Sequence, residues 1–137
     1  MRSEFITLIW LAKFETETQL MNYVAWKYAG NEADPVCGFA TDIGLNYFDS
    51  DFLESSFAET MPGLLEQINN ISFIENFKEQ LLTKISDINY ADKNSVISLS
   101  GRKDIYGGIN EMLFDFTPVT NEKQHLQFAG IFKYTEA

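Results

Sequence analysis

Residues 5–14 of the chain read Phe-Ile-Thr-Leu-Ile-Trp-Leu-Ala-Lys-Phe. Apolar side chains occupy both alternating faces of this stretch, which is typical of a central strand covered on both sides. The apolar run ends at Ala12, too soon to span a membrane, and no small-residue cleavage site of a signal peptide follows it. The sequence therefore predicts an interior strand, and we expect the protein to remain in the cytoplasm, where it is made.

Capping and stop signals divide the next part of the chain into short elements. Thr16 and Gln19 have the spacing of a capping box, and an apolar stripe of Leu20, Val24 and Tyr28 follows at helical spacing. Glycine and capping residues then predict where the following elements begin and end. The expected elements are a helix at 17–29, a loop at 31–38, a helical turn at 39–43 stopped by Gly44, a brief strand at 45–48, and a helix from Asp49 or Ser50 to 57.

The second half of the chain predicts two further helices and then strands. One helix is expected from Thr60, and a long helix from Ser72, which has the spacing of a second capping box with Glu75. Three strands are expected at 95–100, 108–117 and 125–134, as antiparallel neighbours. In the third strand we expect a shared face for Leu126, Phe128, Phe132 and Tyr134. The fold class is α+β: a single domain over residues 1–137, with a mostly antiparallel sheet of about four to five strands and helices between the first strand and a C-terminal β-meander.

Negative charge is concentrated in one segment. The chain has a net charge of -10, yet no Lys or Arg lies between Lys27 and Lys78. This base-free segment holds nine acids: Glu32, Asp34, Asp42, Asp49, Asp51, Glu54, Glu59, Glu66 and Glu75. Such a charge balance argues against nucleic acid or anionic membranes as partners and favours a basic protein. An ordinary solvated acidic face is the alternative interpretation.

Catalytic motifs are missing from the sequence. Cys37 and His125 are the only cysteine and histidine, they lie far apart in the chain, and no nucleophile elbow or phosphate-binding loop occurs. We therefore expect a protein that is not an enzyme and has no cofactor. Asp49, Asp51 and Glu54 could hold Mg²⁺ or Ca²⁺, but their spacing lacks the glycine of a calcium loop, and acids also suit a helix start.

The run from Phe39 to Glu54, FATDIGLNYFDSDFLE, resembles the signature of immunity protein family 22 of bacterial polymorphic toxin systems. The opening, with Trp10, Phe14 and Tyr23, is similar as well, although Ala12 stands where that family has a glycine and Tyr47-Phe48 replaces a Trp-Tyr pair. The resemblance implies a binding protein that neutralises a cognate toxin domain, such as one delivered in contact-dependent inhibition, in the cytosol of the producing cell.

Partner-binding residues are expected among the acids and aromatics of the base-free segment, because interfaces favour aromatic anchors within a polar rim. The predicted residues are Tyr47, Asp49, Asp51, Glu54, Glu59, Glu32 and Asp34. A toxin with a basic surface, as a nuclease needs to hold phosphates, would suit such a site. The alternatives are a small metal-dependent hydrolase that uses Asp49, Asp51 and Glu54, and an adaptor for another basic protein.

Overall fold

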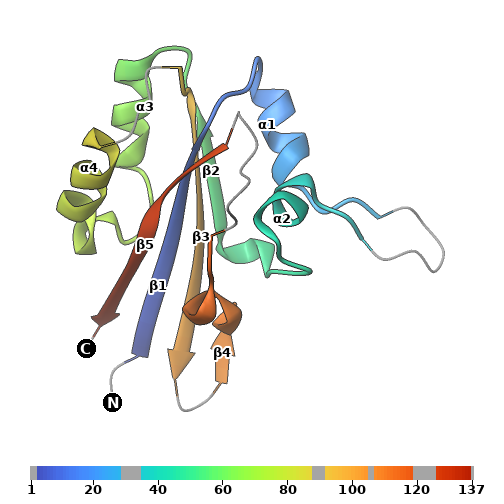
Figure 1. Ribbon diagram of the computed structural model, residues 1–137, viewed down its shortest axis with the longest axis vertical. Helices are drawn as coiled ribbons and strands as arrows, with labels where there is room; N and C mark the ends of the chain where they lie inside the picture. The colour runs from blue at the N-terminus through green and yellow to red at the C-terminus, as the bar shows by residue number, and fades with distance from the viewer. Residues whose placement is uncertain (1–2, 29–34, 88–91, 105–106, 119–125, 137) are drawn as a thin grey trace.

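The structure, a computed structural model, describes residues 3–28, 35–87, 92–104, 107–118 and 126–136. An antiparallel sheet of five strands forms its centre (Figure 1). Strands β2 (Leu53–Phe57), β3 (Ser95–Asp104), β1 (Ser3–Ala12) and β5 (Leu126–Glu136) follow one another across the sheet, and β4 (Gly107–Ile109) pairs with the far end of β3. The predicted α+β class with a mostly antiparallel sheet is confirmed.

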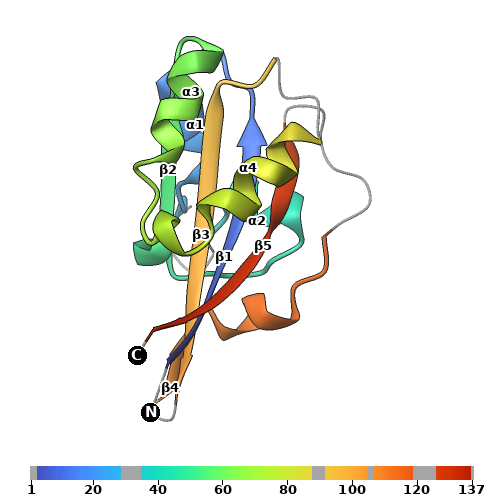
Figure 2. The same cartoon turned by 90° about the vertical axis from the view of Figure 1, so that its left-hand side faces the viewer.

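Helices cover both faces of this sheet (Figure 2). Leu8 and Trp10 of β1 pack with α1 (Glu17–Val24) and α2 (Gly38–Ile43) in one apolar cluster, which we call the α1/α2 core. Ile9 and Leu11 pack with α3 (Met61–Ile68) and α4 (Lys78–Ser86) on the opposite face, in the α3/α4 core. The apolar residues on both faces of β1 thus have a core on either side, and its predicted interior position is confirmed.

The order of the strands differs from the expected row of three C-terminal neighbours. β3 pairs with β4 as expected, but β5 pairs with β1 instead, so that β1 lies between β3 and β5. A strand that is apolar on both faces excludes the most water when it has a strand on each side. The central position of β1 therefore separates β5 from the other two strands.

A β-bulge in β5 changes which side chains share a face. Its register against β1 shifts between Ile9 and Trp10, and Gly130 takes a φ of 145°. The extra residue sends Phe128 into the α1/α2 core and Phe132 into the α3/α4 core. The expected shared face for Leu126, Phe128, Phe132 and Tyr134 is therefore wrong, because the two-residue alternation is interrupted at the bulge.

Three of the predicted element boundaries are confirmed. The Gln19 N–H donates to Thr16 Oγ1 (3.1 Å) at the start of α1, and the Gly63 N–H donates to Thr60 Oγ1 (3.3 Å) at the start of α3. Gly44, with a φ of 81°, ends α2. Helix α1 is shorter than expected, because it ends at Val24 and leaves Tyr28 74% exposed.

The segment 45–57 was predicted wrongly. Residues 45–49 form no strand, and Ser50–Phe52 make a single 3-10 turn, η1, before β2. Leu53 and Phe57 face the α1/α2 core, whereas Glu54 lies between them in the strand and turns to the other face. This two-residue alternation suits a half-buried strand better than the helix expected there.

The long helix expected from Ser72 is also wrong. A 3-10 turn, η2 (Ile74–Asn76), precedes α4, and Phe73 takes a left-handed φ of 64°. The N–H and hydroxyl of Ser72 donate to the carboxylate of Glu54, each at 2.9 Å, in place of the expected capping box with Glu75. A contact with a distant strand therefore replaces the local cap.

The strand expected at 108–117 is limited to β4. Asn110 takes a left-handed φ of 50°, and a 3-10 turn, η3 (Glu111–Asp115), follows it. Leu113 is fully buried in the α1/α2 core, and Met112, Phe114 and Phe116 pack against it. Asn is one of the few residue types that visit this conformation readily, so the strand ends there.

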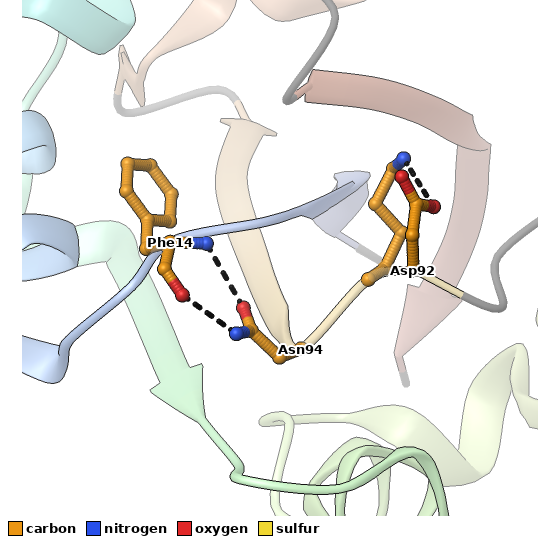
Figure 3. Close-up of polar contacts among 4 residues, drawn as sticks. Phe14, Asp92 and Asn94 are labelled. Carbon is orange, nitrogen blue, oxygen red and sulfur yellow. Dashed lines mark hydrogen bonds and ion pairs between the residues drawn. The ribbon is translucent and has the colours of Figure 1, made fainter.

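Asn94 joins the strands at one end of the sheet. Its side-chain Oδ1 accepts from the Phe14 N–H (3.0 Å) and its Nδ2 donates to the Phe14 carbonyl (2.6 Å), as Figure 3 shows. Its backbone N–H donates to Ala12 and its carbonyl accepts from Ala58. One asparagine thus holds the ends of β1 and β2 against the start of β3.

No helix in the described part of the chain is long and apolar enough to cross a membrane.

Candidate functional site

The segment that carries the family-like motif is held in place by Asn110. The Asn110 side chain accepts from the Asp49 N–H (2.6 Å), and its Nδ2 donates to the carbonyls of Asp49 (3.2 Å) and Ser100 (3.0 Å). These bonds bridge β3 to the chain in front of β2, at the gap between β2 and β4. Sequence reasoning missed Asn110, and its only local signal was an asparagine that follows Gly107-Gly108 near the end of a short strand.

Asp49 has a structural role in addition to its charge. Its Oδ1 accepts from the Asp51 N–H (3.0 Å) and so caps η1, which confirms Asp49 as a capping residue, although for a 3-10 turn instead of an α-helix. Its side chain is half-buried, whereas that of Asp51 is exposed. Of these two predicted site residues, Asp51 is therefore the more accessible to a partner.

Tyr47 reaches solvent, as expected, with 62% of its surface exposed. Its ring stacks on Trp26 at 5.6 Å between centroids and an angle of 26°. Trp26 also packs on Phe48, which is fully buried in the α1/α2 core (5.1 Å). Trp26 therefore lies between the buried Phe48 and the exposed Tyr47. One face of the Tyr47 ring packs on Trp26, which leaves the rest of the side chain open to solvent. Sequence reasoning missed Trp26, an aromatic residue just beyond the end of α1.

Glu54 and Glu59 lie on opposite sides of β2. Glu54 is half-buried on the α3/α4 side, where its carboxylate accepts both donors of Ser72. Glu59 is exposed after the end of β2, and it lines a hollow together with Glu15 and Glu17. The structure therefore adds two acids from outside the base-free segment to the surroundings of Glu59. The predicted Glu32 and Asp34 lie outside the described residues.

None of Asp49, Asp51, Glu54 and Glu59 forms an ion pair in the described part of the chain. Ion pairs join Lys93 to Asp92 (2.9 Å) and Arg102 to Asp104 (3.4 Å), away from these four acids. No direct ion pair with a described base therefore offsets their negative charge. Within those residues, no three His, Cys, Asp or Glu side chains come together as metal ligands would.

Tyr23 and Cys37 lie beside α2, the first half-buried and the second buried. The Tyr23 hydroxyl donates to Asp42 Oδ2 (2.7 Å), and burial, together with this bond, raises the pKa of Tyr23 well above its ordinary value. Cys37 is 2% exposed, with its Sγ 3.5 Å from the Val24 carbonyl, and burial raises the pKa of its thiol. A buried thiol whose pKa is raised in this way is a packing group and a poor nucleophile. His125 lies outside the described residues.

A hollow of about 770 Å³ lies on the other side of α1, between the end of β1 and the segment that leads into α2. Lys13 and Lys27 border it, and Phe14 and Tyr23 provide apolar surface. None of the predicted site residues lines this hollow. Glu15 borders both this hollow and the one beside Glu59, so the two hollows adjoin at the start of α1.

A family model described as Immunity protein 22 matches residues 7–135 of the chain. The match covers all five strands and all four α-helices, except for the ends of β1 and β5. No curated protein and no solved structure matches the chain.

Proposed function

The chain belongs to the Immunity protein 22 family, and from this premise we propose that it binds a cognate bacterial toxin domain in the cytoplasm and neutralises it by forming a stable complex. In this role the protein is a non-catalytic partner, and residues 1–137 act as a single immunity-protein domain. Contact-dependent inhibition is the delivery route that we propose for the toxin.

The observation that carries this proposal is a pair of exposed acids that form no ion pair in the described structure, in a segment that also carries an exposed, stacked aromatic ring. Asp51 and Glu59 present exposed carboxylates that form no ion pair among the described residues, and the exposed ring of Tyr47 stacks on Trp26. Aromatic anchors with a charged rim are typical of protein interfaces, and acidic surfaces accelerate encounters with basic partners. We propose Tyr47, Asp49, Asp51, Glu54 and Glu59, with Glu32 and Asp34 of the neighbouring loop, as the surface that meets the toxin.

A basic toxin surface is the matching chemistry. Enzymes that cleave nucleic acid hold phosphates with Lys and Arg, so a nuclease toxin presents the complementary charge. Covering such a surface with acids would both bind the toxin and exclude its substrate. We therefore propose a nuclease as the toxin class.

The metal-dependent hydrolase has weaker support. Its three carboxylates are directed apart, because Asp49 caps η1 while Glu54 turns to the α3/α4 side and accepts from Ser72. Calorimetry with Mg²⁺, Mn²⁺ and Ca²⁺ tests this alternative directly. Binding at millimolar metal that is lost in Glu54→Gln would favour the hydrolase over the immunity protein.

The test of the proposed function is co-expression with the toxin domain encoded by the neighbouring upstream gene. Cells that produce the toxin domain should survive only when this chain is present, and the two proteins should co-purify. Association measured by stopped flow should slow as salt rises, because screening weakens attraction between charged surfaces. Growth arrest in the presence of both proteins, with no complex formed, would contradict the proposal.

A further inference from the structure

The outer edge of β2 is unpaired in the described structure. β2 is the last strand in the sheet order and pairs with β3 alone, and Figure 2 shows it at the left-hand edge of the sheet. Native proteins usually block such edges with Lys, Pro or a β-bulge. Residues 53–57, Leu-Glu-Ser-Ser-Phe, have none of these, whereas β5, at the opposite side of the sheet, has a bulge and Lys133.

The hydrogen-bonding pattern identifies the groups that face outward. In an antiparallel pair, residues alternate between those that bond the neighbouring strand and those that point away from it. The Ala58 N–H donates to the Asn94 carbonyl (2.8 Å), so even-numbered residues of this strand face β3. The N–H and C=O groups of Ser55 and Phe57 therefore point outward, and no described residue bonds them.

Acids stand at both ends of this edge. The exposed Asp51 precedes β2, and the exposed Glu59 follows it, next to Glu15 and Glu17. The chain has no Lys or Arg from residue 28 to residue 77. A chain segment that paired with β2 would therefore run between two negatively charged ends, and a basic segment fits that charge.

A polar cavity of about 290 Å³ opens beside the edge. Glu54, Ser55, Ser56, Asn70 and Ser98 contribute to its walls. Ser98 is 2% exposed, and its hydroxyl has no hydrogen-bond partner among the described residues. A buried hydroxyl without a partner is costly, so a donor that enters this cavity would gain both the Ser98 oxygen and the Glu54 carboxylate.

We propose that an extended, basic segment of the toxin domain adds to the sheet as a strand against β2, and that one of its Lys or Arg side chains enters the cavity between Glu54 and Ser98. In this mode of recognition, main-chain hydrogen bonds supply affinity and side-chain pockets supply specificity. The inference rests on the proposed function and states how the partner is held.

Ser55→Pro tests the edge with little risk to the fold. The Ser55 N–H points away from β3, and proline is tolerated where the missing N–H faces solvent. Ser55→Ala is the matched control, because it removes the side chain and keeps the N–H. Binding to the toxin domain should weaken by about tenfold or more in Ser55→Pro and stay within about twofold of wild type in Ser55→Ala, because the main-chain bond carries the affinity. Far-ultraviolet circular dichroism and urea unfolding check that both variants fold.

Amide hydrogen exchange gives a second readout that needs no substitution. The Ser55 and Phe57 amides should exchange quickly in the free protein and become protected in the complex, because they gain a strand partner. Equal toxin affinity in folded Ser55→Pro and wild type, or amides that stay unprotected in the complex, would overturn the inference and leave the proposed function intact. Absence of any wild-type complex would contradict both.

A second copy of the chain is the other possible occupant of the edge. Analytical ultracentrifugation of the free protein distinguishes it from the toxin. A monomer that keeps fast exchange at Ser55 and Phe57 supports the toxin segment as the occupant. A dimer that Ser55→Pro dissociates would overturn the inference.

Discussion

The side chain of Asn110 hydrogen-bonds the backbone of Asp49 at both its N–H (2.6 Å) and its carbonyl (3.2 Å), across 61 positions of sequence. Asn94 does the same for Phe14 at the other end of the sheet. In both places an amide side chain hydrogen-bonds the backbone of a segment that no strand pairs with at that point. The position of the Tyr47–Glu54 segment on the sheet therefore depends on Asn110, the N-cap residue of η3.

Asn110 should stabilise the protein in two ways that two variants can separate: through its side-chain hydrogen bonds and through its tolerance of a left-handed backbone. Asn110→Gly keeps the left-handed backbone and loses the three side-chain bonds, which should cost about 2 kcal/mol. Asn110→Ala should cost about 1 kcal/mol more, because a Cβ disfavours a positive φ. Urea unfolding measures both, and equal stabilities of the two variants would contradict the backbone argument.

Substitutions at the adjacent residues Tyr47 and Phe48 should have different effects: one should weaken toxin binding, and the other should lower stability. Phe48→Ala empties a fully buried site and should lower the free energy of unfolding by about 3–5 kcal/mol. Tyr47→Ala removes an exposed ring and should cost about 1 kcal/mol or less in stability, most of it from the stack on Trp26. The affinity of the Tyr47→Ala variant for the toxin should fall about tenfold or more, because the ring is proposed as an interface anchor. Unchanged affinity in Tyr47→Ala would remove it from the interface.

Neutralising the exposed acids should act on the association rate. Asp51→Asn and Glu59→Gln each remove one exposed charge and keep the side-chain shape, so each should slow association with the toxin and weaken its salt dependence. Glu79→Gln on α4 is the matched control, because Glu79 is exposed but lies outside the base-free segment. Stopped-flow rates at low and high salt provide the comparison. An equal effect of Glu79→Gln would indicate that only net charge matters.

The Tyr23–Asp42 contact should make stability fall in alkaline solution. Because burial and Asp42 raise the pKa of Tyr23 in the folded state, its contribution is complete below its unfolded pKa and is lost as the pH rises above it. Tyr23→Phe should cost about 1 kcal/mol at pH 7, and the difference from wild type should shrink from about pH 9 to 11, where tyrosine in the unfolded chain ionises. Urea unfolding across this range measures the difference. A constant difference would show that Tyr23 ionises alike in both states.

Local sequence was sufficient wherever the decisive neighbours are close in the chain. The double-sided apolar pattern of residues 5–14 predicted a central strand, and Thr16 and Thr60 predicted where two helices begin. Gly44 predicted the end of α2. These signals depend on side-chain alternation or on hydrogen bonds within a single turn, so the rest of the fold does not alter them.

Tertiary structure decided the elements whose partners are distant. Ser72 bonds Glu54, 18 positions away, instead of capping a helix with Glu75, and Asn110 ends a strand to hold Asp49. For the candidate site, sequence provided the acids and the exposed Tyr47, whereas the fold added Trp26 as a support and turned Glu54 away from Asp49. The five-residue strand at 53–57 forms where β3 offers a pairing edge, and β3 lies about 40 positions further along the chain, so no local pattern could identify this partner. Local patterns state which conformations a segment can adopt, and long-range hydrogen bonds and burial select among them.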